Sequence, residues 1–314
     1  MFAIGVENLS AAWLTLLAGA VLALALGAWR ARRAGIENRR IALAAVLAPL
    51  LTAFFSHLCY CLVDLENVLY LYSFGHLFAF WERGYMFWGG ILGAVLALAA
   101  AGGKQRLKLM DAFAPSLALM TAAARIAEGF MGQGYGEYWY EEEIFLCRFP
   151  FMTWDPYYES WGWALFMAEA LVAVIVLMIL LKKKNAWPGD GMLLFAGLYA
   201  APQIVLESLR RDEFLRWGFV RVEEVFSGVV ILLVLILFCI RSGHGRHLQK
   251  ALCFVLFVAM VVFCLLLEFA TEGRIPFLLL EVWQCYAFMA AASAVCAACV
   301  LWMRGMTLKR SDTE

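Results

Sequence analysis

Nine long runs of mainly apolar residues divide this sequence, and only short polar stretches separate them. A helix needs about 20 such residues to cross the hydrocarbon core of a bilayer. A soluble globule could not cover these runs, because 64% of the residues are hydrophobic and only 16% are charged. We therefore expect an all-α fold, a polytopic membrane helix bundle with about nine transmembrane helices. The expected spans are 11–29, 41–62, 85–102, 111–131, 161–181, 190–209, 219–240, 251–268 and 280–303.

Two stretches between the runs have a different character. The apolar run 69–81 is too short to cross a bilayer, so we expect a re-entrant or interfacial piece. Segment 132–160 is rich in Tyr, Trp and Glu, and it could form a small lid or head at the membrane surface, although aromatic residues gather at membrane interfaces in any case. We expect a membrane core at 1–245 that includes this external segment. Residues 246–314 would add a helical pair and a cytoplasmic tail.

Charged residues predict the orientation of the chain. Lys and Arg gather in alternate loops, which places those loops in the cytoplasm, the N terminus outside and the C terminus inside. Glu7 precedes the first span and Arg30 follows it, the reverse of a signal peptide, so this span should remain in the mature chain. The basic stretches are 30–40, 104–108, 182–184, 241–250 and 304–310, whereas the opposite side carries Glu137, Glu141, Glu142, Glu143, Asp155 and Glu159.

Ionisable residues inside the spans mark the candidate site, because a charge at the bilayer centre costs about 2.5–3.5 kcal/mol on insertion scales. Arg125 and Glu128 share one face of the fourth span, and a purely structural ion pair would also explain them. Seven residues stand out by polarity or by their place in a motif, and the alternating topology places all seven in the outer half of the bilayer, which predicts one shared cavity. The group comprises His57, Trp88, Arg125, Glu128, Glu169, Glu207 and Arg210.

The nine cysteines do not indicate metal or redox chemistry. Eight of them lie among apolar neighbours in expected helices, where cysteine behaves as a small hydrophobic residue. Cys296 and Cys299 have the spacing of a ligand pair but lack a second pair, and only Cys147 falls in an external loop. We expect no metal, no cofactor, no disulfide framework and no nucleic-acid partner.

Three motifs follow one another in the order of a known family. They are WERGYMFWGGILG at 81–93, ARIAEGFMGQGYG at 124–136, preceded by Asp111-x-x-x-Pro115, and PGDGMLLFAGLYAAPQIVLESLRR at 188–211. Together they resemble the signatures of the prolipoprotein diacylglyceryl transferase family, over most of residues 41–240. The resemblance implies a multi-pass protein of the bacterial cytoplasmic (inner) membrane. A member of this family would move the diacylglyceryl group of phosphatidylglycerol to the lipobox cysteine of a preprolipoprotein and release glycerol 1-phosphate.

The resemblance also implies partners and residue roles. The partners would be a membrane phospholipid, with phosphatidylglycerol or another headgroup, and a preprolipoprotein signal peptide. Arg125 matches the signature arginine and would clamp the phosphate, since its planar fork binds two oxygens. Glu207 and Arg210 match an E-x-x-R pair, and Glu169 matches a glutamate of the family. The expected substrate-binding residues are Arg125, Glu169, Glu207, Arg210, Gln203, Trp88, Gln133 and Gly136.

Several motif positions depart from the family pattern. The family histidine is replaced here by Trp88, so another group would have to act as base, and we hypothesise His57 or Glu128 together with Arg125 as the catalytic set. The alternative function is a catalytically inactive relative that serves as a lipid- or lipoprotein-binding scaffold or regulator. A transporter is a weaker third reading, because the inner halves of the spans carry almost no ionisable residues. The other departures are Glu128 and Met131 for asparagines, Gln133 for a glutamate and Gln203 for an arginine.

Overall fold

The computed structural model describes most of the chain. The expected acidic residues Glu141, Glu142 and Glu143 lie outside the described residues, as do the side chains of Asp155 and Arg310. The described ranges are 8–82, 84–139, 147–155, 159–211, 215–218, 220–243, 245–271, 274 and 280–311.

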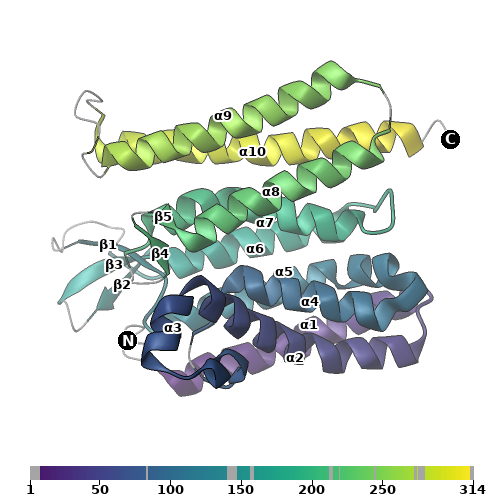
Figure 1. The fold of residues 1–314 in the computed structure, drawn as a ribbon, viewed down its shortest axis with the longest axis horizontal. Coiled ribbons are helices and arrows are strands. Elements are labelled where there is room, and N and C mark those ends of the chain that lie inside the picture. The colour runs from purple at the N-terminus through teal and green to yellow at the C-terminus, as the bar shows by residue number, and fades with distance from the viewer. Residues whose placement is uncertain are drawn as a thin grey trace.

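Long helices that run roughly parallel to one another build the molecule (Figure 1). Within the described residues, eight helical segments are long and apolar enough to cross a membrane. One of them, Phe87–Phe130, holds two helices, α4 and α5, which lie side by side after the chain turns at Gly103. The expected all-α polytopic membrane bundle is confirmed. Its long helices are α1 Leu9–Arg33, α2 Asn38–Val63, α4 Phe87–Gly102, α5 Arg106–Phe130, α6 Leu165–Lys182, α7 Asp190–Leu209, α8 Val222–Arg241, α9 His247–Thr271 and α10 Val282–Ser311.

Small residues allow the helices to approach closely. A Cβ added at Gly93 of α4 would lie 2.1 Å from the carbonyl oxygen of Leu51 in α2. One added at Gly89 would lie 2.6 Å from the carbonyl oxygen of Phe55. Lipid tails are as apolar as the helix faces, so helices associate in a membrane largely through such close packing. The glycines at the start of α4 therefore have a clear structural role between α2 and α4.

Two small sheets cover one end of the bundle (Figure 1). Strands β1 Tyr135–Trp139, β2 Met152–Asp155 and β3 Ser160–Ala164 form an antiparallel sheet in the order β1-β3-β2. A short hairpin joins β4 Arg216–Trp217 to β5 Val220–Arg221. The described part of segment 132–160 thus forms a small sheet at a helix end. The expected start of the fifth span was wrong, because residues 160–164 pair as β3 and α6 begins at Leu165. The expected start of the seventh span, at 219, was also wrong, because residues 220 and 221 pair as β5 and α8 begins at Val222.

The run 69–81 does not form a long helix. It contributes to the short helix α3 Leu65–Leu71 and to the 3-10 helix η1 Phe74–Phe78, both packed near the end of α2. Neither is long enough to span a bilayer, since an α-helix rises only about 1.5 Å per residue. The stretch is therefore a non-spanning piece, as its length predicted.

The last two helices are attached to the rest of the bundle by polar contacts as well as apolar packing. The hydroxyl of Ser293 in α10 donates a 2.8 Å hydrogen bond to the carbonyl of Ala201 in α7. Arg304 of α10 pairs with the fully buried Asp190 at the start of α7, at 2.7 Å. The bonds between Arg304 and Asp190 join two charged groups, so they are stronger than the bond between the neutral groups of Ser293 and Ala201. The helix α10 is thus fixed to α7 by one polar contact in its first half and one near its C-terminal end.

Candidate functional site

The ends of five helices meet beside the two sheets and bring buried charges together. Arg125 and Glu128 lie in the last two turns of α5, and Glu169 lies in the second turn of α6. Glu207 and Arg210 lie at the end of α7, where the backbone of Arg210 leaves the helical conformation. We call Arg125, Glu128, Glu169, Glu207 and Arg210 the charge cluster; α4 and α8 begin next to it.

Arg125 is the centre of the charge cluster, and only 2% of its surface is exposed. Its Nη1 donates to both carboxylate oxygens of Glu128, at 2.9 and 3.0 Å. Its Nε donates to the hydroxyl of Tyr199 at 2.9 Å and lies 2.8 Å from a carboxylate oxygen of Glu169. Its Nη2 lies 3.5 Å from the amide oxygen of Gln203. The guanidinium is therefore held from α5, α6 and α7 at once.

Arg210 is the second arginine that contacts the carboxylates of the charge cluster. Its Nη1 lies 3.4 Å from Glu128 Oε2, 3.5 Å from Glu207 Oε1 and 3.8 Å from Glu169 Oε1. The carboxylate of Glu128 consequently lies between two guanidinium groups. Its side chain is 25% exposed, whereas those of the other four members are exposed by 5% or less. Glu128 forms the accessible edge of the charge cluster.

The charge cluster holds more acid than base. Two arginines face three carboxylates, which gives a formal charge of −1 when all five groups are ionised. Two buried atoms beside Arg125 also lack a hydrogen-bond partner within the described chain, namely Oε2 of Glu207 and Nε2 of Gln203. Buried polar groups are normally paired. The site therefore offers one donor and one acceptor to a polar ligand.

Sequence reasoning missed three residues that complete this site. Tyr199 bonds to Arg125, and Phe87 places its ring 4.8 Å from the Arg125 guanidinium carbon. Glu223, at the start of α8, accepts a 2.6 Å hydrogen bond from the amide of Phe87 and so caps the start of α4. One signal was available, because Tyr199 precedes Gln203 and Glu207 at a spacing of four residues on one helix face.

Trp88 lies next to the charge cluster but is bound elsewhere. Its indole Nε1 donates to the hydroxyl of Ser227 at 2.9 Å, and that hydroxyl donates to the carbonyl of Glu223 at 2.7 Å. Its ring centroid lies 6.4 Å from that of Tyr199, and only 5% of the residue is exposed. Trp88 is therefore part of the wall that supports Tyr199.

Gln133 and Gly136 follow the end of α5. The backbone amide of Gln133 donates a 3.0 Å hydrogen bond to the backbone carbonyl of Glu128, whereas the Gln133 side chain is exposed. Gly136 is buried in β1, where an added Cβ would lie 3.1 Å from side-chain atoms of both Trp163 and Leu165. These two residues lie between the charge cluster and the sheet, and no contact in the described chain joins either of them to the Arg125 side chain.

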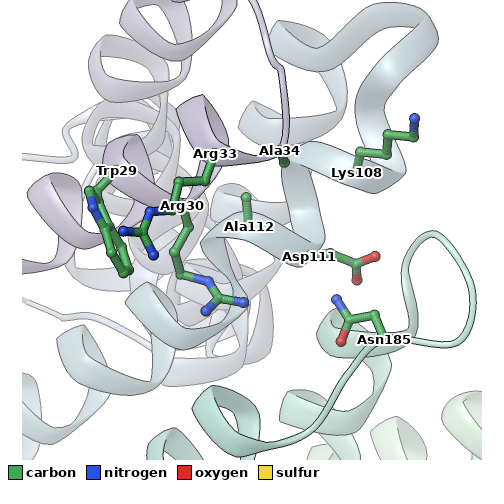
Figure 2. Close-up of a pocket in the computed structure, with 8 residues that line it drawn as sticks. All are labelled: Trp29, Arg30, Arg33, Ala34, Lys108, Asp111, Ala112 and Asn185. Carbon is green, nitrogen blue, oxygen red and sulfur yellow. The ribbon is translucent and has the colours of Figure 1, made fainter.

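A second polar site lies at the opposite end of α5, about 21 Å along the helix from Arg125. It is a pocket of about 400 Å³ between the end of α1, the start of α5 and the loop before α7 (Figure 2). Arg30, Arg33, Lys108 and Asp111 contribute its charged groups. This pocket is separate from the charge cluster.

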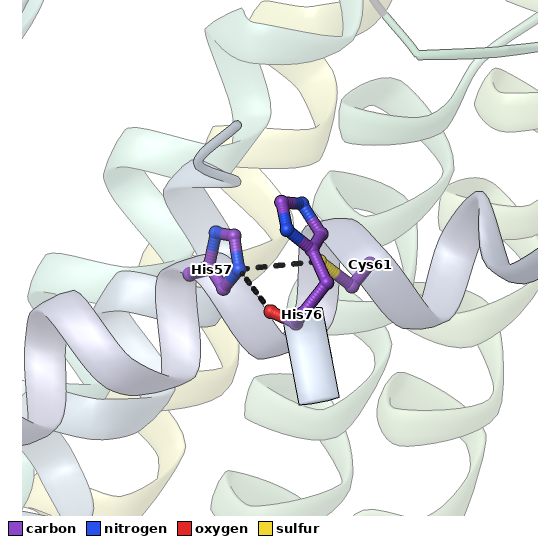
Figure 3. A group of neighbouring side chains, drawn as sticks. All are labelled: His57, Cys61 and His76. Atoms are coloured by element: carbon purple, nitrogen blue, oxygen red, sulfur yellow. Dashed lines mark hydrogen bonds between the residues drawn. The ribbon is translucent and has the colours of Figure 1, made fainter. Parts of the chain in front are cut away.

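His57 belongs to a third group, formed with His76 and Cys61 (Figure 3). Its Nδ1 lies 3.0 Å from the carbonyl of Gly84, and its Nε2 lies 2.9 Å from the carbonyl of His76 and 3.4 Å from the Cys61 sulfur. None of its hydrogen-bond or ring partners in the described chain belongs to the charge cluster. The buried ring thus ties α2 to the segment before α4.

The same three residues are the ones that could hold a metal ion. One ligand atom from each lies within 4.8 Å of the others, and imidazole with thiolate is a donor set that suits zinc. Both ring nitrogens of His57 already face carbonyl oxygens at hydrogen-bond distance. A neutral imidazole carries one N–H, so one of these carbonyl groups accepts a hydrogen bond from the ring, and this bond gives the buried histidine a partner without a metal.

Comparison with known proteins places the chain in a family. Residues 2–241 match the model of the prolipoprotein diacylglyceryl transferase family. The phosphatidylglycerol–prolipoprotein diacylglyceryl transferase of Clostridium kluyveri is 28% identical over 172 residues, which cover 51% of this chain and 65% of the relative. The enzyme of the same name from Bacillus licheniformis is 28% identical over 177 residues, which cover 54% of this chain and 66% of the relative. The one from Streptococcus pyogenes is 23% identical over 251 residues, which cover 75% of this chain and 92% of the relative.

The matched stretch thus spans just under two thirds of the first two relatives. The family model ends at residue 241, so α9 and α10 lie beyond it. Its match includes all of the charge cluster, from α5 to the end of α7. The resemblance that the three motifs suggested is confirmed: this chain belongs to the prolipoprotein diacylglyceryl transferase family.

Proposed function

We propose that this protein transfers the diacylglyceryl group of phosphatidylglycerol to the cysteine thiol of a prolipoprotein at the membrane surface. Family membership supports the reaction type. The observation that carries the proposal is the carboxylate of Glu128 held between Arg125 and Arg210. Two guanidinium groups that converge on one anion form a natural seat for a phosphate, because each planar fork can bind two of its oxygens.

In the proposed reaction, the cysteine sulfur forms a bond to the terminal glyceryl carbon of the diacylglyceryl group. The bond between that carbon and the phosphate oxygen breaks, and glycerol 1-phosphate leaves with the bonding electron pair. Arg125 and Arg210 stabilise the negative charge that grows on the departing phosphate. Such preorganised charge at a buried site is commonly the largest contribution to catalysis.

The reaction also needs a base, since a cysteine thiol has a pKa of about 8.5 and its thiolate is the nucleophile. Glu128 is suited to this role, because it is the most accessible member of a charge cluster in which acids outnumber arginines. When the lipid phosphate displaces its carboxylate from the two arginines, that carboxylate becomes free to accept the thiol proton. His57 is the second candidate, and a His57→Ala variant with full turnover would exclude it.

We propose that the charge cluster faces the outside of the bacterial cytoplasmic membrane, with the N terminus outside and the C terminus inside. The opposite helix ends carry Arg30, Arg33, Lys108, Lys182 and Lys183. Lys and Arg favour cytoplasmic loops, which supports this orientation. It would present the site to lipids of the outer leaflet and to the signal peptide of an exported preprolipoprotein.

We further propose that residues 1–245 form the transferase core and that 246–314 brace it. The buried pair of Asp190 and Arg304 supports a bracing role, because it joins α10 to the first turn of α7. The helix α7 carries Tyr199, Gln203 and Glu207 to the charge cluster. The contact between α10 and α7 would hold these side chains in position beside Arg125.

A catalytically inactive, lipid-binding scaffold is the second candidate. The bond of Trp88 to Ser227 favours it, because the residue at the family's histidine position serves here in packing. Under this reading, the charge cluster would bind a phospholipid or lipoprotein without turnover.

Expression in cells depleted of their own transferase separates the two candidates. Incorporation of labelled acyl chains into a reporter lipoprotein should depend on Arg125 and be lost in Arg125→Ala. Arg211→Ala is the matched control, because Arg211 is one residue from Arg210 but its side chain is 48% exposed and pairs only loosely with Glu137, at 3.9 Å. No incorporation by the wild-type chain, with phosphatidylglycerol binding retained, would favour the scaffold.

A further inference from the structure

The pocket at the other end of α5 carries cations that no acidic side chain of the described chain pairs with (Figure 2). Arg30, Arg33 and Lys108 line it, and none of the three has an ion pair or side-chain hydrogen bond within the described chain. The Nε of Arg30 is buried and has no hydrogen-bond partner there. Buried guanidinium nitrogens are normally paired, so this one is available to a ligand.

The one carboxylate in the pocket is already engaged. Asp111 accepts hydrogen bonds from the backbone amides of Gly189, at 2.7 Å, and Gly191, at 2.8 Å. These bonds fix the start of α7 and direct the carboxylate away from the arginines (Figure 2). Three cations against one engaged carboxylate leave the pocket with a formal charge of about +2. This charge suits a phosphate group.

The position of the pocket suits a lipid. Arg30 and Arg33 lie in the last turn of α1, so they reach the level of the bilayer surface when α1 spans the membrane. Trp29 is 47% exposed in the same turn, and Arg33 places its guanidinium carbon 4.0 Å from the centre of the Trp29 ring. Below them, α1 exposes Val21 and Leu22, each by 59%, as a surface for acyl chains. Tryptophan is favoured at this depth because its ring is apolar and its N–H is polar.

We propose that this pocket binds the headgroup phosphate of an anionic phospholipid in the leaflet opposite the charge cluster. The phosphate is held by Arg30 and Arg33, Lys108 adds attraction at the rim, and the acyl chains lie along the exposed face of α1. A free phosphate shares the headgroup chemistry but would gain nothing from the apolar face of α1. The pocket and the charge cluster use different residues, so this proposal does not rest on the transferase reaction.

Native mass spectrometry of the full chain in detergent can test the site. The probes are dioleoyl phosphatidylglycerol, dioleoyl phosphatidylcholine and inorganic phosphate. The double variant Arg30→Gln/Arg33→Gln should weaken the binding of one phosphatidylglycerol and raise its dissociation constant on the order of 10-fold, because two partly solvent-exposed charge contacts are removed. Arg32→Gln/Arg39→Gln is the matched control, since it removes equal charge from exposed positions at the same end of the bundle.

The possible outcomes separate cleanly. Loss of the bound phosphatidylglycerol in the pocket variant alone supports the proposal, and a smaller weakening in Lys108→Gln would add to it. Equal binding by the wild type and the pocket variant overturns it, as does equal retention of phosphatidylcholine. Full displacement of the lipid by millimolar inorganic phosphate would also overturn it, since the site would then take a free anion. Equal thermal unfolding of both double variants shows that folding is not the cause.

Discussion

The place of Glu128 between two arginines leads to a prediction that runs against the usual effect of a mutation in a binding site. Both oxygens of its carboxylate accept hydrogen bonds from Arg125 Nη1, at 2.9 and 3.0 Å, and its Oε2 lies 3.4 Å from Arg210 Nη1. An anionic headgroup that binds these arginines must displace or approach this charge. We therefore expect Glu128→Gln to strengthen the binding of phosphatidylglycerol, even if it slows turnover.

The size of the effect follows from Coulomb's law. A phosphate bound to the same nitrogens would lie about 5 Å from the Glu128 carboxylate. For this edge, at 25% exposure, we use an effective dielectric constant of about 40, between about 20 near a protein surface and about 80 in water. Two unit charges at that separation repel by about 1.7 kcal/mol. Removing the charge should lower the dissociation constant roughly 15-fold. The amide oxygen of glutamine can still accept a hydrogen bond from Arg125, so the guanidinium should keep its place.

Titration of the detergent-solubilised protein with a short-chain phosphatidylglycerol would measure this change directly. Glu137→Gln is the matched control, because it removes the same charge from an exposed position on β1, outside the charge cluster. High salt should leave the difference between the variants largely intact if the site is shielded from ions. An unchanged or weaker affinity of Glu128→Gln for phosphatidylglycerol would refute the idea that the Glu128 carboxylate occupies the phosphate-binding position.

Three further predictions concern the site and the packing that supports it. Arg125→Lys keeps the charge but loses the planar fork, so transferase activity should fall roughly 100-fold, measured as acyl incorporation per mole of folded protein. Gly93→Ala places a Cβ against a backbone carbonyl of α2 and should destabilise the fold by about 1–3 kcal/mol. Gly228 has open space around it, so Gly228→Ala should leave the stability unchanged, and thermal unfolding in detergent distinguishes the two variants. Arg304→Gln leaves Asp190 buried without its cation and should cost about 3–5 kcal/mol in the same assay, and an unchanged melting temperature would contradict the bracing role of α10.

The class of the protein and the approximate spans were predictable because both depend on contiguous sequence. A bilayer imposes one length on every crossing helix, so apolar runs of the right length reveal the spans without knowledge of their packing. The starts of the fifth and seventh spans were exceptions, because each lies before the helix, next to or within a strand. Residues 160–164 are apolar enough for a helix but pair with two other strands as β3. Strand pairing depends on distant residues, and local hydropathy cannot report it.

The candidate site was predictable only in part. Charged residues are rare in spans, so Arg125 and Glu169 could be singled out, and alternating topology predicted that they lie at the same end. Sequence could not tell which side chains actually touch. His57 lies at a comparable position along its helix but faces the carbonyl groups of His76 and Gly84 instead of Arg125.

The sequence by itself determined that this chain is a multi-pass membrane protein, which family it resembles and which polar residues lie within its spans. Tertiary structure alone decided that Glu128 lies between two arginines, that Tyr199 joins them and that Trp88 bonds to Ser227. The physical reason is the difference between position along a helix and rotation about its axis. Apolar length sets the first, whereas the second depends on how small and large residues of neighbouring helices fit together.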